Sequence, residues 1–508
     1  MKKAAGVIGL VALALMAPAL IHGAPTADSG SYNYIWTSQI AEEMARGVLY
    51  PRWLPRSFEG LGAPTFYFYP PLAYWIAGLL AQVMDAGRAL GAAAFVLLYA
   101  SGLAMYAWLK PRTPYALVGA CLYMLAPYHV ADFYVRSALA EFGAFAWLPL
   151  IALGIDRVDR RSGPPLLAVA YAGLLCTHLP TALLASALLI PPLVIWRCRL
   201  QPALLVRCGL AGVAGVLLAA FYLAPALTLQ DQTLMQPLLW GHRFDPLPNS
   251  ALGFFINPHP WLVITTEIGA AWALIAVVAL MAPRTNRLWP ILTLATVACA
   301  MGLIPLLWLP FLRKIQFPWR ALEIVEFVGV TTIALGLSRP LVLAIVAGFA
   351  VQALVPFSDA ALRHEPMPPY LTAHQVDALE YLPAEFRPVP QTRSPPDLSH
   401  LAGPLVQGAV QTGAGPDGSV SLRATADGPV TIRRAKFPRW QVSGPRGPAP
   451  LLPGPLVSFE ARAGESYRLA PVRTPAEAAG LWLSLIGLVL TAALWRFGTM
   501  PAREPFSG

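Results

Sequence analysis

Apolar runs of about 20 residues follow one another along most of this chain, and no other feature constrains its fold as strongly. Such runs cross a bilayer as α-helices because lipid offers no hydrogen-bond partner to an exposed backbone group. Of the 508 residues, 56% are hydrophobic and 12% are charged, whereas soluble domains have roughly 25% charged residues. The sequence therefore predicts an all-α polytopic membrane protein.

The number and direction of the spans follow from the apolar runs and from the basic residues between them. Lys and Arg in short loops are typical of the cytoplasmic side. The clusters Arg157–Arg161 and Arg197–Arg207 both reach that side if the short apolar stretch Pro71–Met84 lies in the interface instead of crossing. About 12 transmembrane helices result, with both termini cytoplasmic. The predicted spans are Ala4–Ile21, Ala89–Leu109, Tyr115–His129, Leu139–Ile155, Leu166–Thr177, Thr181–Trp196, Cys208–Leu227, Ile268–Ala282, Trp289–Phe311, Ala321–Leu337, Leu341–Phe357 and Ala478–Trp495.

The first apolar run allows two interpretations. Lys2 and Lys3 precede it and the small pair Gly23-Ala24 follows it, which is the pattern of a cleaved signal peptide. The run is also long enough to remain as the first span, which we favour. In both cases the following loop lies outside the membrane.

Four regions follow from these patterns. Residues 1–357 form the multi-span domain, with a first outer loop at 23–88 that carries the catalytic residues; residues 358–412 form an outer linker with a short helix; residues 413–475 form an outer β-sandwich; and residues 476–508 form the last span and a cytoplasmic tail. The β-sandwich is expected because Val420–Ala424 and Val430–Arg433 alternate with the two-residue period of strands. Turn pairs such as Asp427-Gly428 separate these strands.

Several polar residues gather on the expected outer side and are candidates for a site. Asp28 lies early in the first loop, and Asp132, Arg136 and Glu141 lie where the third and fourth spans meet. Asp132 and Arg136 are four positions apart, so one helical face could carry both. Glu141 precedes an apolar run, and a carboxylate at membrane depth is usually paired or functional. His178, Lys314, Trp319 and Arg320 complete the outer set.

Each candidate also has a structural interpretation. Asp28 or Asp132 could cap a helix, Glu141 could form an ion pair with Arg136, and His178 could be hydrogen-bonded at a helix end. Arg320 and Lys314 could be interfacial cations that extend to the membrane surface. Two further acids, Glu323 and Glu326, could neutralise Arg320 or each other.

Other functional classes have less support. The five cysteines lie in or beside apolar segments, without disulfide or zinc-ligand spacing. The net charge of +10 fits basic cytoplasmic loops, and no nucleic-acid-binding motif accompanies it.

The first 200 residues resemble the GT-C-type membrane glycosyltransferases. The resemblance consists of the loop acid Asp28, the amphipathic run Ile35–Ala45, the Tyr-Pro-Pro-Leu-Ala-Tyr-Trp segment Tyr69–Trp75 and the acidic cluster after the third span. The segment is similar to one in the aminoarabinose and protein-mannosyl transferases, which usually carry a charged residue where Tyr69 stands.

Two further resemblances cover other parts of the chain. One is to bacterial membrane proteins labelled as related to 6-pyruvoyl-tetrahydropterin synthase, although nothing of that soluble enzyme's chemistry is present. It rests on Tyr134-Val135-Arg136 with Glu141, and on Thr177–Thr181, Gln316–Arg320 and Glu380–Pro383. The segment Phe437–Trp440 is similar to the outer β-domain of YfhO-like glycosyltransferases.

The GT-C resemblance implies an enzyme of the bacterial cytoplasmic (inner) membrane. It would move a sugar from a polyprenyl-phosphate donor to an unknown acceptor, which is a glycan, a lipid or a protein, on the outer face with inversion. Asp28 would act as general base, or would ligate a divalent metal (Mg, Mn or Zn) together with Glu141. Arg320 with Lys314 or Arg136 would hold the phosphate, and Asp132, His178, Tyr69 and Trp319 would complete the substrate site.

Two other classes remain open at this stage. A transporter or flippase of lipid-linked sugars would have paired repeats with broken helices, which are not evident in the sequence. The third possibility is a non-catalytic membrane assembly protein.

Overall fold

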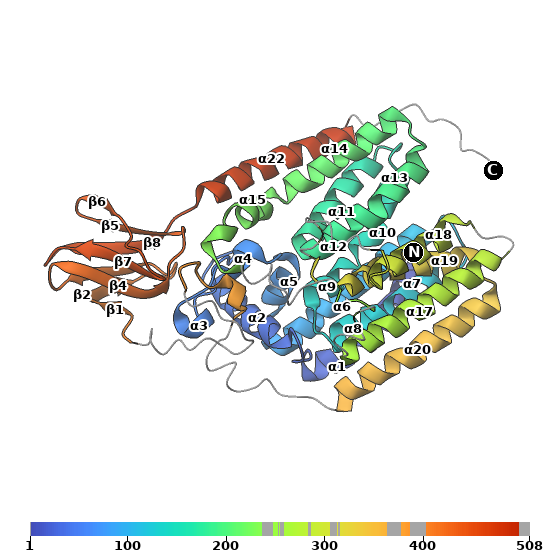
Figure 1. The fold of residues 1–508 in the computed structure, drawn as a ribbon, viewed down its shortest axis with the longest axis horizontal. Coiled ribbons are helices and arrows are strands. Elements are labelled where there is room, and N and C mark those ends of the chain that lie inside the picture. Colours follow the sequence, from blue (N-terminus) through green and yellow to red (C-terminus); the bar gives the residue numbers. More distant parts are fainter. Residues whose placement is uncertain are drawn as a thin grey trace.

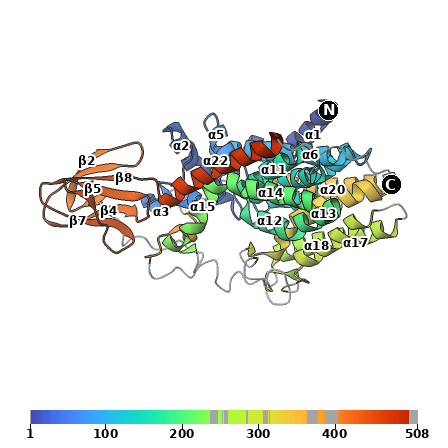
Figure 2. The ribbon, with the colours of Figure 1, turned by 90° about the horizontal axis from the view of Figure 1, so that it is seen from above.

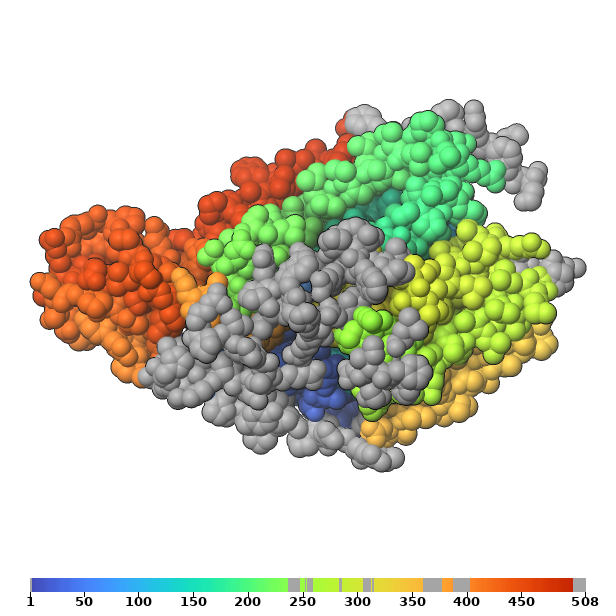
Figure 3. Space-filling view, in the orientation of Figure 1, coloured from blue at the N-terminus to red at the C-terminus, as the bar shows by residue number. Residues whose placement is uncertain are grey.

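The computed structural model describes residues 2–235, 247–251, 253, 259–282, 286–304, 312, 315–362, 377–386 and 403–496. These residues form a helical part and a small β-domain at one end of it (Figures 1 and 2). The space-filling view shows the β-domain as a separate lobe next to the beginning of the last helix (Figure 3).

The helical part consists mainly of apolar helices packed side by side. They are α1 (Lys2–His22), α6 (Ala86–Leu109), α7 (Ala116–Met124), α8 (Pro127–Tyr134), α9 (Leu139–Ala144), α10 (Trp147–Asp156), α11 (Gly163–Thr177), α12 (Leu179–Leu184), the π-helix η1 (Ala185–Leu189), α13 (Ile190–Cys198), α14 (Pro202–Leu218), α15 (Ala220–Thr228), α17 (Pro260–Met281), α18 (Leu288–Ala300), α19 (Leu322–Gly336), α20 (Arg339–Leu362) and α22 (Pro475–Arg496).

Eight helical segments in the described residues are long and apolar enough to cross a membrane, or nine if one bent pair counts as a span. The chain is therefore a largely helical membrane protein, but the expected count of twelve spans is not confirmed. The bent pair is α14 with α15, which meet at 71°. Three further predicted spans correspond to shorter helices, α11, α18 and α19, which have 15, 13 and 15 residues. Helices of this length extend about 20 Å, less than the roughly 30 Å of a hydrocarbon core.

Helix ends that carry arginines converge at the end of the helical part remote from the β-domain. Arg112 Nη2, just after α6, lies 2.7 Å from Asp156 Oδ2 at the end of α10. Arg161 Nε donates to the carbonyl of Trp495, near the end of α22, at 2.7 Å. These contacts bring together the loops that the sequence assigns to the cytoplasm.

The first loop, residues 23–85, is folded against the opposite end of the helical part. It contains α2 (Gly30–Ala45), α3 (Ser57–Gly60), α4 (Thr65–Phe68) and α5 (Leu72–Leu80). The nine-residue α5 is too short to span a bilayer, in agreement with the interfacial position expected for Pro71–Met84. Trp36 of α2 packs its ring against Phe66, Tyr69 and Tyr74, with centroid distances of 4.7–5.7 Å.

The β-domain consists of two antiparallel sheets. Their strand orders are β1-β4-β7 and β2-β3-β8-β5-β6. Buried residues alternate along the inner strands, and Phe459 contacts Tyr467 of the other sheet at a ring-centroid distance of 5.0 Å. The strands are β1 (Val406–Gln407), β2 (Ala409–Ala414), β3 (Val420–Ala424), β4 (Gly428–Ala435), β5 (Trp440–Gly444), β6 (Gly447–Ala449), β7 (Leu456–Ala461) and β8 (Ser466–Pro471). The first two strands begin before residue 413, where the sequence placed the start of this domain.

The β-domain is attached to the first loop by direct contacts. The Ala435 amide donates to the Leu61 carbonyl at 2.8 Å, and Phe437 packs on Tyr67 at a centroid distance of 4.9 Å. Thus the first loop lies between the helical part and the β-domain.

Candidate functional site

Glu141 of α9 is the centre of a buried group of charged side chains. Its Oε2 lies 2.9 Å from Arg136 Nη1 and 3.2 Å from Arg320 Nε, while its Oε1 accepts a hydrogen bond from the Tyr128 hydroxyl. The residue is 2% exposed. The ion pair with Arg136 anticipated from the sequence is present, but the carboxylate holds a second cation as well.

Arg136 also pairs with Asp132 of α8, whose Oδ1 lies 2.7 Å from Arg136 Nη1. The spacing of four positions brings the two side chains together, but they do not share a helical face, because α8 ends at Tyr134, two residues before Arg136. Arg136 lies in the turn between α8 and α9, where Ser137 has a φ of +53°. Few residues other than glycine adopt this conformation without support, and here the Asn33 amide donates to the Ser137 carbonyl from α2. The first loop thus fixes the turn that presents Arg136.

Glu326 of α19 holds the beginning of α8. Its two carboxylate oxygens accept hydrogen bonds from the Tyr128 and His129 amides at 2.6 and 3.0 Å. These amides lie in the first turn of the helix and have no intrahelical acceptor. Because Pro127 begins α8 and the preceding Ala126 has no side-chain oxygen, the cap comes from another helix. The possibility that Glu326 neutralises Arg320 or Glu323 is not realised among the described residues.

His178 separates α11 from α12 and faces two carboxylates. Its Nε2 lies 4.0 Å from Glu141 Oε2, and its Nδ1 lies 2.6 Å from the Thr181 hydroxyl. Thr181 in turn donates to Glu323 Oε1 at 2.7 Å. The backbone of His178 is extended, with φ −156°, at the break between the two helices, where Pro180 in the first turn of α12 lacks the amide hydrogen that would continue α11.

We call Asp132, Arg136, Glu141, His178, Arg320 and Glu323 the buried ion cluster. With all acids ionised it contains three carboxylates and two guanidinium groups. The buried Asp132 Oδ2 and Glu323 Oε2 atoms have no hydrogen-bond partner among the described residues. Unpaired buried carboxylate oxygens are costly, so the cluster favours an added proton or cation.

A metal ion is one cation that the cluster could hold. Glu141, His178 and Glu323 each offer a ligand atom, and these atoms lie within 4.8 Å of one another. One histidine with two carboxylates is a donor set for Zn²⁺ or Mn²⁺. The sequence instead paired Asp28 with Glu141 as metal ligands, and the structure groups His178 and Glu323 with Glu141.

Asp28 lies at the beginning of α2 with an exposed side chain and a φ of +44°. Among the residues that the structure describes, no hydrogen bond or ion pair joins Asp28 to Glu141 or Asp132. The Ser29 amide, however, donates to the Arg136 carbonyl at 3.2 Å. The N-cap position of α2 belongs to Ser29, so Asp28 does not cap this helix, and it lies one residue before the amide that bonds to Arg136.

Tyr69 and Trp319 flank the cluster from two sides. Tyr69 packs on Trp36 and Tyr74, and its phenol is close enough to Arg320 for an electrostatic effect. Burial raises the pKa of Tyr69 to about 12, so its hydroxyl is neutral near pH 7. Trp319 stacks on Phe317 at a centroid distance of 4.6 Å. Lys314, also expected here, lies outside the described residues.

Sequence analysis missed the roles of Tyr128, Thr181 and Glu323. Thr181 lies within the Thr177–Thr181 motif and Tyr128 within the predicted third span, but nothing in their spacing shows that they would meet a carboxylate. Glu323 follows Arg320 by three positions, yet it hydrogen-bonds to Thr181, 142 positions away. The usable signal was the presence of acids in an otherwise apolar span.

Comparisons with known proteins add little. Neither a protein-family model nor a curated protein matches this chain, so the proteins labelled as related to 6-pyruvoyl-tetrahydropterin synthase and the YfhO-like β-domain remain resemblances. Among solved structures, the cryo-EM structure of a mutant of arabinofuranosyltransferase AftD from Mycobacteria is similar, with 15% identity and a TM-score of 0.42. The match covers 72% of this chain and 28% of that chain. A likeness at this level carries no argument about the activity of this chain.

Proposed function

We propose that this chain is a membrane glycosyltransferase that uses a polyprenyl-phosphate sugar on the outer side of a bacterial cytoplasmic membrane. The observation that carries the proposal is the pair of guanidinium groups held by Glu141, with the exposed Asp28 one residue before Ser29, whose amide bonds to the Arg136 carbonyl. Charged side chains at membrane depth are retained mainly where they bind or react. Arginine pairs are also well suited to phosphate.

Arg136 and Arg320 are the proposed phosphate ligands. Neither Nη2 group donates a hydrogen bond to any residue that the structure describes, and neither is among the buried unpaired atoms. Each arginine therefore has donors left for a phosphate oxygen while its other donors hold it in place. During transfer they would stabilise the negative charge that develops on the departing phosphate.

Asp28 is the proposed general base. Its exposed position allows an acceptor hydroxyl to approach from the aqueous side, while Glu141 positions the two arginines from the buried side. The acceptor oxygen would form a bond to the anomeric carbon as the bond from that carbon to the phosphate oxygen breaks. The acceptor proton passes to the Asp28 carboxylate, and one displacement inverts the anomeric centre.

A divalent metal fits this proposal without being required by it. Glu141, His178 and Glu323 would hold the ion, and Glu323 Oε2 would gain the partner that it lacks. When bound, the ion would supply Lewis-acid stabilisation of a phosphate oxygen.

A groove beside α8 offers a place for the lipid chain. This cavity of about 570 Å³ is bordered by α8, α17 and α20, and Val130, Ala131 and Val135 form one of its walls. Asp132 of the buried ion cluster belongs to the same helix. A polyprenyl chain in the groove would place its phosphate near Arg136.

The test uses purified full-length protein in liposomes with a panel of radiolabelled polyprenyl-phosphate monosaccharides. Transfer is measured as the release of free polyprenyl phosphate together with labelled product. We expect Asp28→Asn to lower the rate about 100-fold or more, and Arg320→Ala to lower it to a similar extent. The matched controls are Asp85→Asn and Arg88→Ala, an exposed pair at the start of α6, which should leave the rate unchanged.

The outcomes separate the three functional classes. Transfer that survives both Asp28→Asn and Glu141→Gln would contradict the catalytic assignment. Movement of intact donor between leaflets without loss of its sugar would indicate a flippase. A protein that supports neither process would be a non-catalytic assembly factor.

A further inference from the structure

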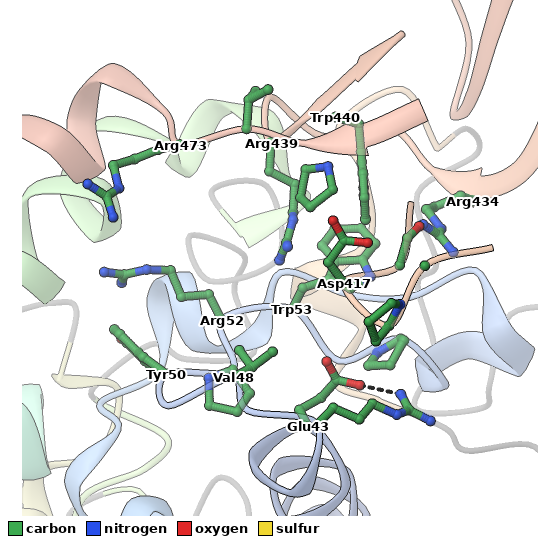
Figure 4. Close-up of a pocket in the computed structure, with 18 of the residues that line it drawn as sticks. Glu43, Val48, Tyr50, Arg52, Trp53, Asp417, Arg434, Arg439, Trp440 and Arg473 are labelled. Carbon is green, nitrogen blue, oxygen red and sulfur yellow. Dashed lines mark hydrogen bonds and ion pairs between the residues drawn. The ribbon is translucent and has the colours of Figure 1, made fainter. Parts of the chain in front are cut away.

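A second hollow, separate from the buried ion cluster, lies between the first loop, the β-domain and the beginning of α22. Figure 4 shows this cavity of about 640 Å³, with Arg439 and Trp440 above and Arg52, Trp53 and Glu43 below. In this view the Arg439 side chain points from the β-domain towards the loop that carries Arg52. The cavity therefore has charged and aromatic walls from parts of the chain nearly 400 positions apart.

The charges of the walls are unbalanced. Five arginines and three carboxylates line the cavity: Arg46, Arg52, Arg434, Arg439, Arg473, Glu43, Asp417 and Glu477. Arg46 pairs with Glu43 at 2.6 Å, and Arg52 pairs with Glu477 at 3.0 Å. Among the described residues, the other three arginines have no carboxylate within ion-pair distance. The cavity thus has unmatched positive charge.

Two of these unpaired arginines are also poorly hydrated. Burial lowers the pKa of Arg434 to about 10, and burial also lowers the pKa of Arg439. The third carboxylate, Asp417, acts on Arg434 and offsets its burial only in part, and Asp417 Oδ1 also accepts the Ser419 amide in a turn. An anion in the cavity would therefore replace lost hydration of both guanidinium groups.

Aromatic rings border the same space. The Cζ atoms of Arg434 and Arg439 lie 4.5 and 4.8 Å from the centroid of Trp440. Trp53 meets Trp440 nearly at right angles, at a centroid distance of 5.3 Å. The Trp440 ring thus holds the two guanidinium groups in place beside the cavity through cation–π contacts.

Three buried N–H groups of the lining residues have no acceptor. Arg52 Nη1, Arg439 Nε and Trp440 Nε1 are buried without a hydrogen-bond partner among the described residues. Arg52 is 9% exposed and Trp440 is 4% exposed. Unsatisfied buried donors cost free energy, so their gathering around one cavity favours a ligand rich in oxygen acceptors.

We propose that this cavity binds an anionic saccharide, with its oxyanion at Arg434 and Arg439 and its hydroxyl oxygens on the unpartnered N–H groups of the walls. The oxyanion is a carboxylate or a phosphate, which share this recognition. A saccharide fits better than a lipid headgroup because most of the wall comes from the β-domain and the first loop, and only the first turn of α22 contributes from a spanning helix. The site goes beyond the proposed transfer reaction and does not depend on it.

The test measures binding directly, by native mass spectrometry and calorimetry on full-length protein in neutral phosphatidylcholine nanodiscs. The probes are a glucuronate-containing tetrasaccharide, glucose 6-phosphate, neutral maltotetraose and inorganic phosphate. We expect one or both anionic sugars to bind, and Arg439→Ala and Arg434→Ala each to weaken binding at least 10-fold. Arg446→Ala is the matched control, because Arg446 belongs to the same domain, is exposed and lies outside the cavity.

Every outcome bears on the proposal. Preference for the tetrasaccharide or for glucose 6-phosphate identifies the oxyanion. Equal binding of maltotetraose, equal binding of inorganic phosphate, or absence of binding would overturn the proposal, as would occupation of the cavity by phosphatidylglycerol in a second set of nanodiscs that contain this lipid. Arg439→Lys distinguishes lost recognition from misfolding. Lysine keeps the positive charge but lacks the planar guanidinium group, so this variant should bind the saccharide more weakly than wild type at an unchanged unfolding temperature.

Discussion

At the scale of single residues, Glu141 determines the electrostatics of the membrane part. Its Oε2 atom is shared by Arg136, five positions earlier in the chain, and Arg320, 179 positions later. Without this carboxylate Arg136 would keep only Asp132, and Arg320 would have no carboxylate partner among the described residues. A buried pair adds little net stability when intact, but the loss of one partner is expensive.

Replacement of Glu141 by Gln should therefore destabilise the protein as well as affect activity. We expect a loss of about 3 kcal/mol, since two guanidinium groups lose their shared carboxylate. Unfolding in a denaturing detergent series would measure it. The control is Glu42→Gln, which breaks an exposed pair with Arg56 at 2.8 Å and should cost less than about 1 kcal/mol. Equal effects of the two substitutions would show that the buried ion cluster is not a stabilising unit.

The metal site gives a second prediction at this scale. If Glu141, His178 and Glu323 bind an ion, Zn²⁺ or Mn²⁺ should raise the unfolding temperature of the wild type. Stabilisation reaches about 2.7 kcal/mol when the ion is at 100 times its dissociation constant. His178→Ala should abolish this effect, whereas His22→Ala, an exposed histidine at the end of α1, should preserve it. Elemental analysis of purified protein provides a measurement independent of stability.

At the scale of elements, a single carboxylate ties the described part of the outer linker to the first loop. Asp377 is fully buried and accepts four hydrogen bonds at 2.7–2.8 Å, from Trp36 Nε1, Ser57 Oγ, Thr65 Oγ1 and the Ala378 amide. Three donors thus come from α2, α3 and α4, which otherwise share few contacts. Asp377 fixes the loop between the buried ion cluster and the β-domain cavity.

Replacement of Asp377 by Ala should loosen the first loop without affecting the helical part. Each buried donor left without an acceptor costs about 1–3 kcal/mol. Hydrogen exchange should accelerate across residues 57–68 and remain unchanged in α6. Glu380→Ala, three positions later in the same segment, serves as the comparison. Unchanged exchange at residues 57–68 would mean that other contacts hold the loop.

The last helix depends on close backbone approach. A Cβ atom at Gly487 would lie 2.6 Å from the Leu218 amide nitrogen. Ser484 of the same helix accepts from the Phe221 amide and donates to the Leu218 carbonyl, which satisfies groups that the bend between α14 and α15 exposes. Small residues that allow such contact are typical of packed membrane helices.

Gly487→Val should therefore separate α22 from the α14–α15 bend. Overpacking of this kind costs about 1–3 kcal/mol, which thermal unfolding would detect. Gly212→Val is the matched control, because a Cβ atom at Gly212 would meet nothing within 4 Å. If both valines have the same effect, close packing at Gly487 does not explain the loss.

At the scale of the whole molecule, the sequence locates most elements but not the way they meet. Each of the twelve predicted spans contains helix among the described residues, since apolar periodicity is local, but the third, fourth, sixth and seventh are each divided between two or more helices. The bend before Phe221 and the short α18 and α19 depend on packing between helices, which hydropathy does not encode. The same limit explains the site: Asp132 and Arg136 are one helical turn apart and were predictable. The contacts of Glu141 with His178 and Arg320 join separate helices and were not.

The orientation of the whole molecule is the remaining expectation that a simple experiment can test. The arginine-rich helix ends and the β-domain lie at opposite ends of the molecule (Figures 1 and 2), and basic loops are expected to face the cytoplasm. We expect a membrane-impermeant maleimide to label Arg446→Cys in intact cells and to label Arg160→Cys only after permeabilisation. Both positions are exposed, and four of the five native cysteines are buried, so the unsubstituted protein provides the background. The reverse pattern would place the buried ion cluster and the saccharide cavity on the cytoplasmic side, where a donor presented from the outer leaflet could not reach them.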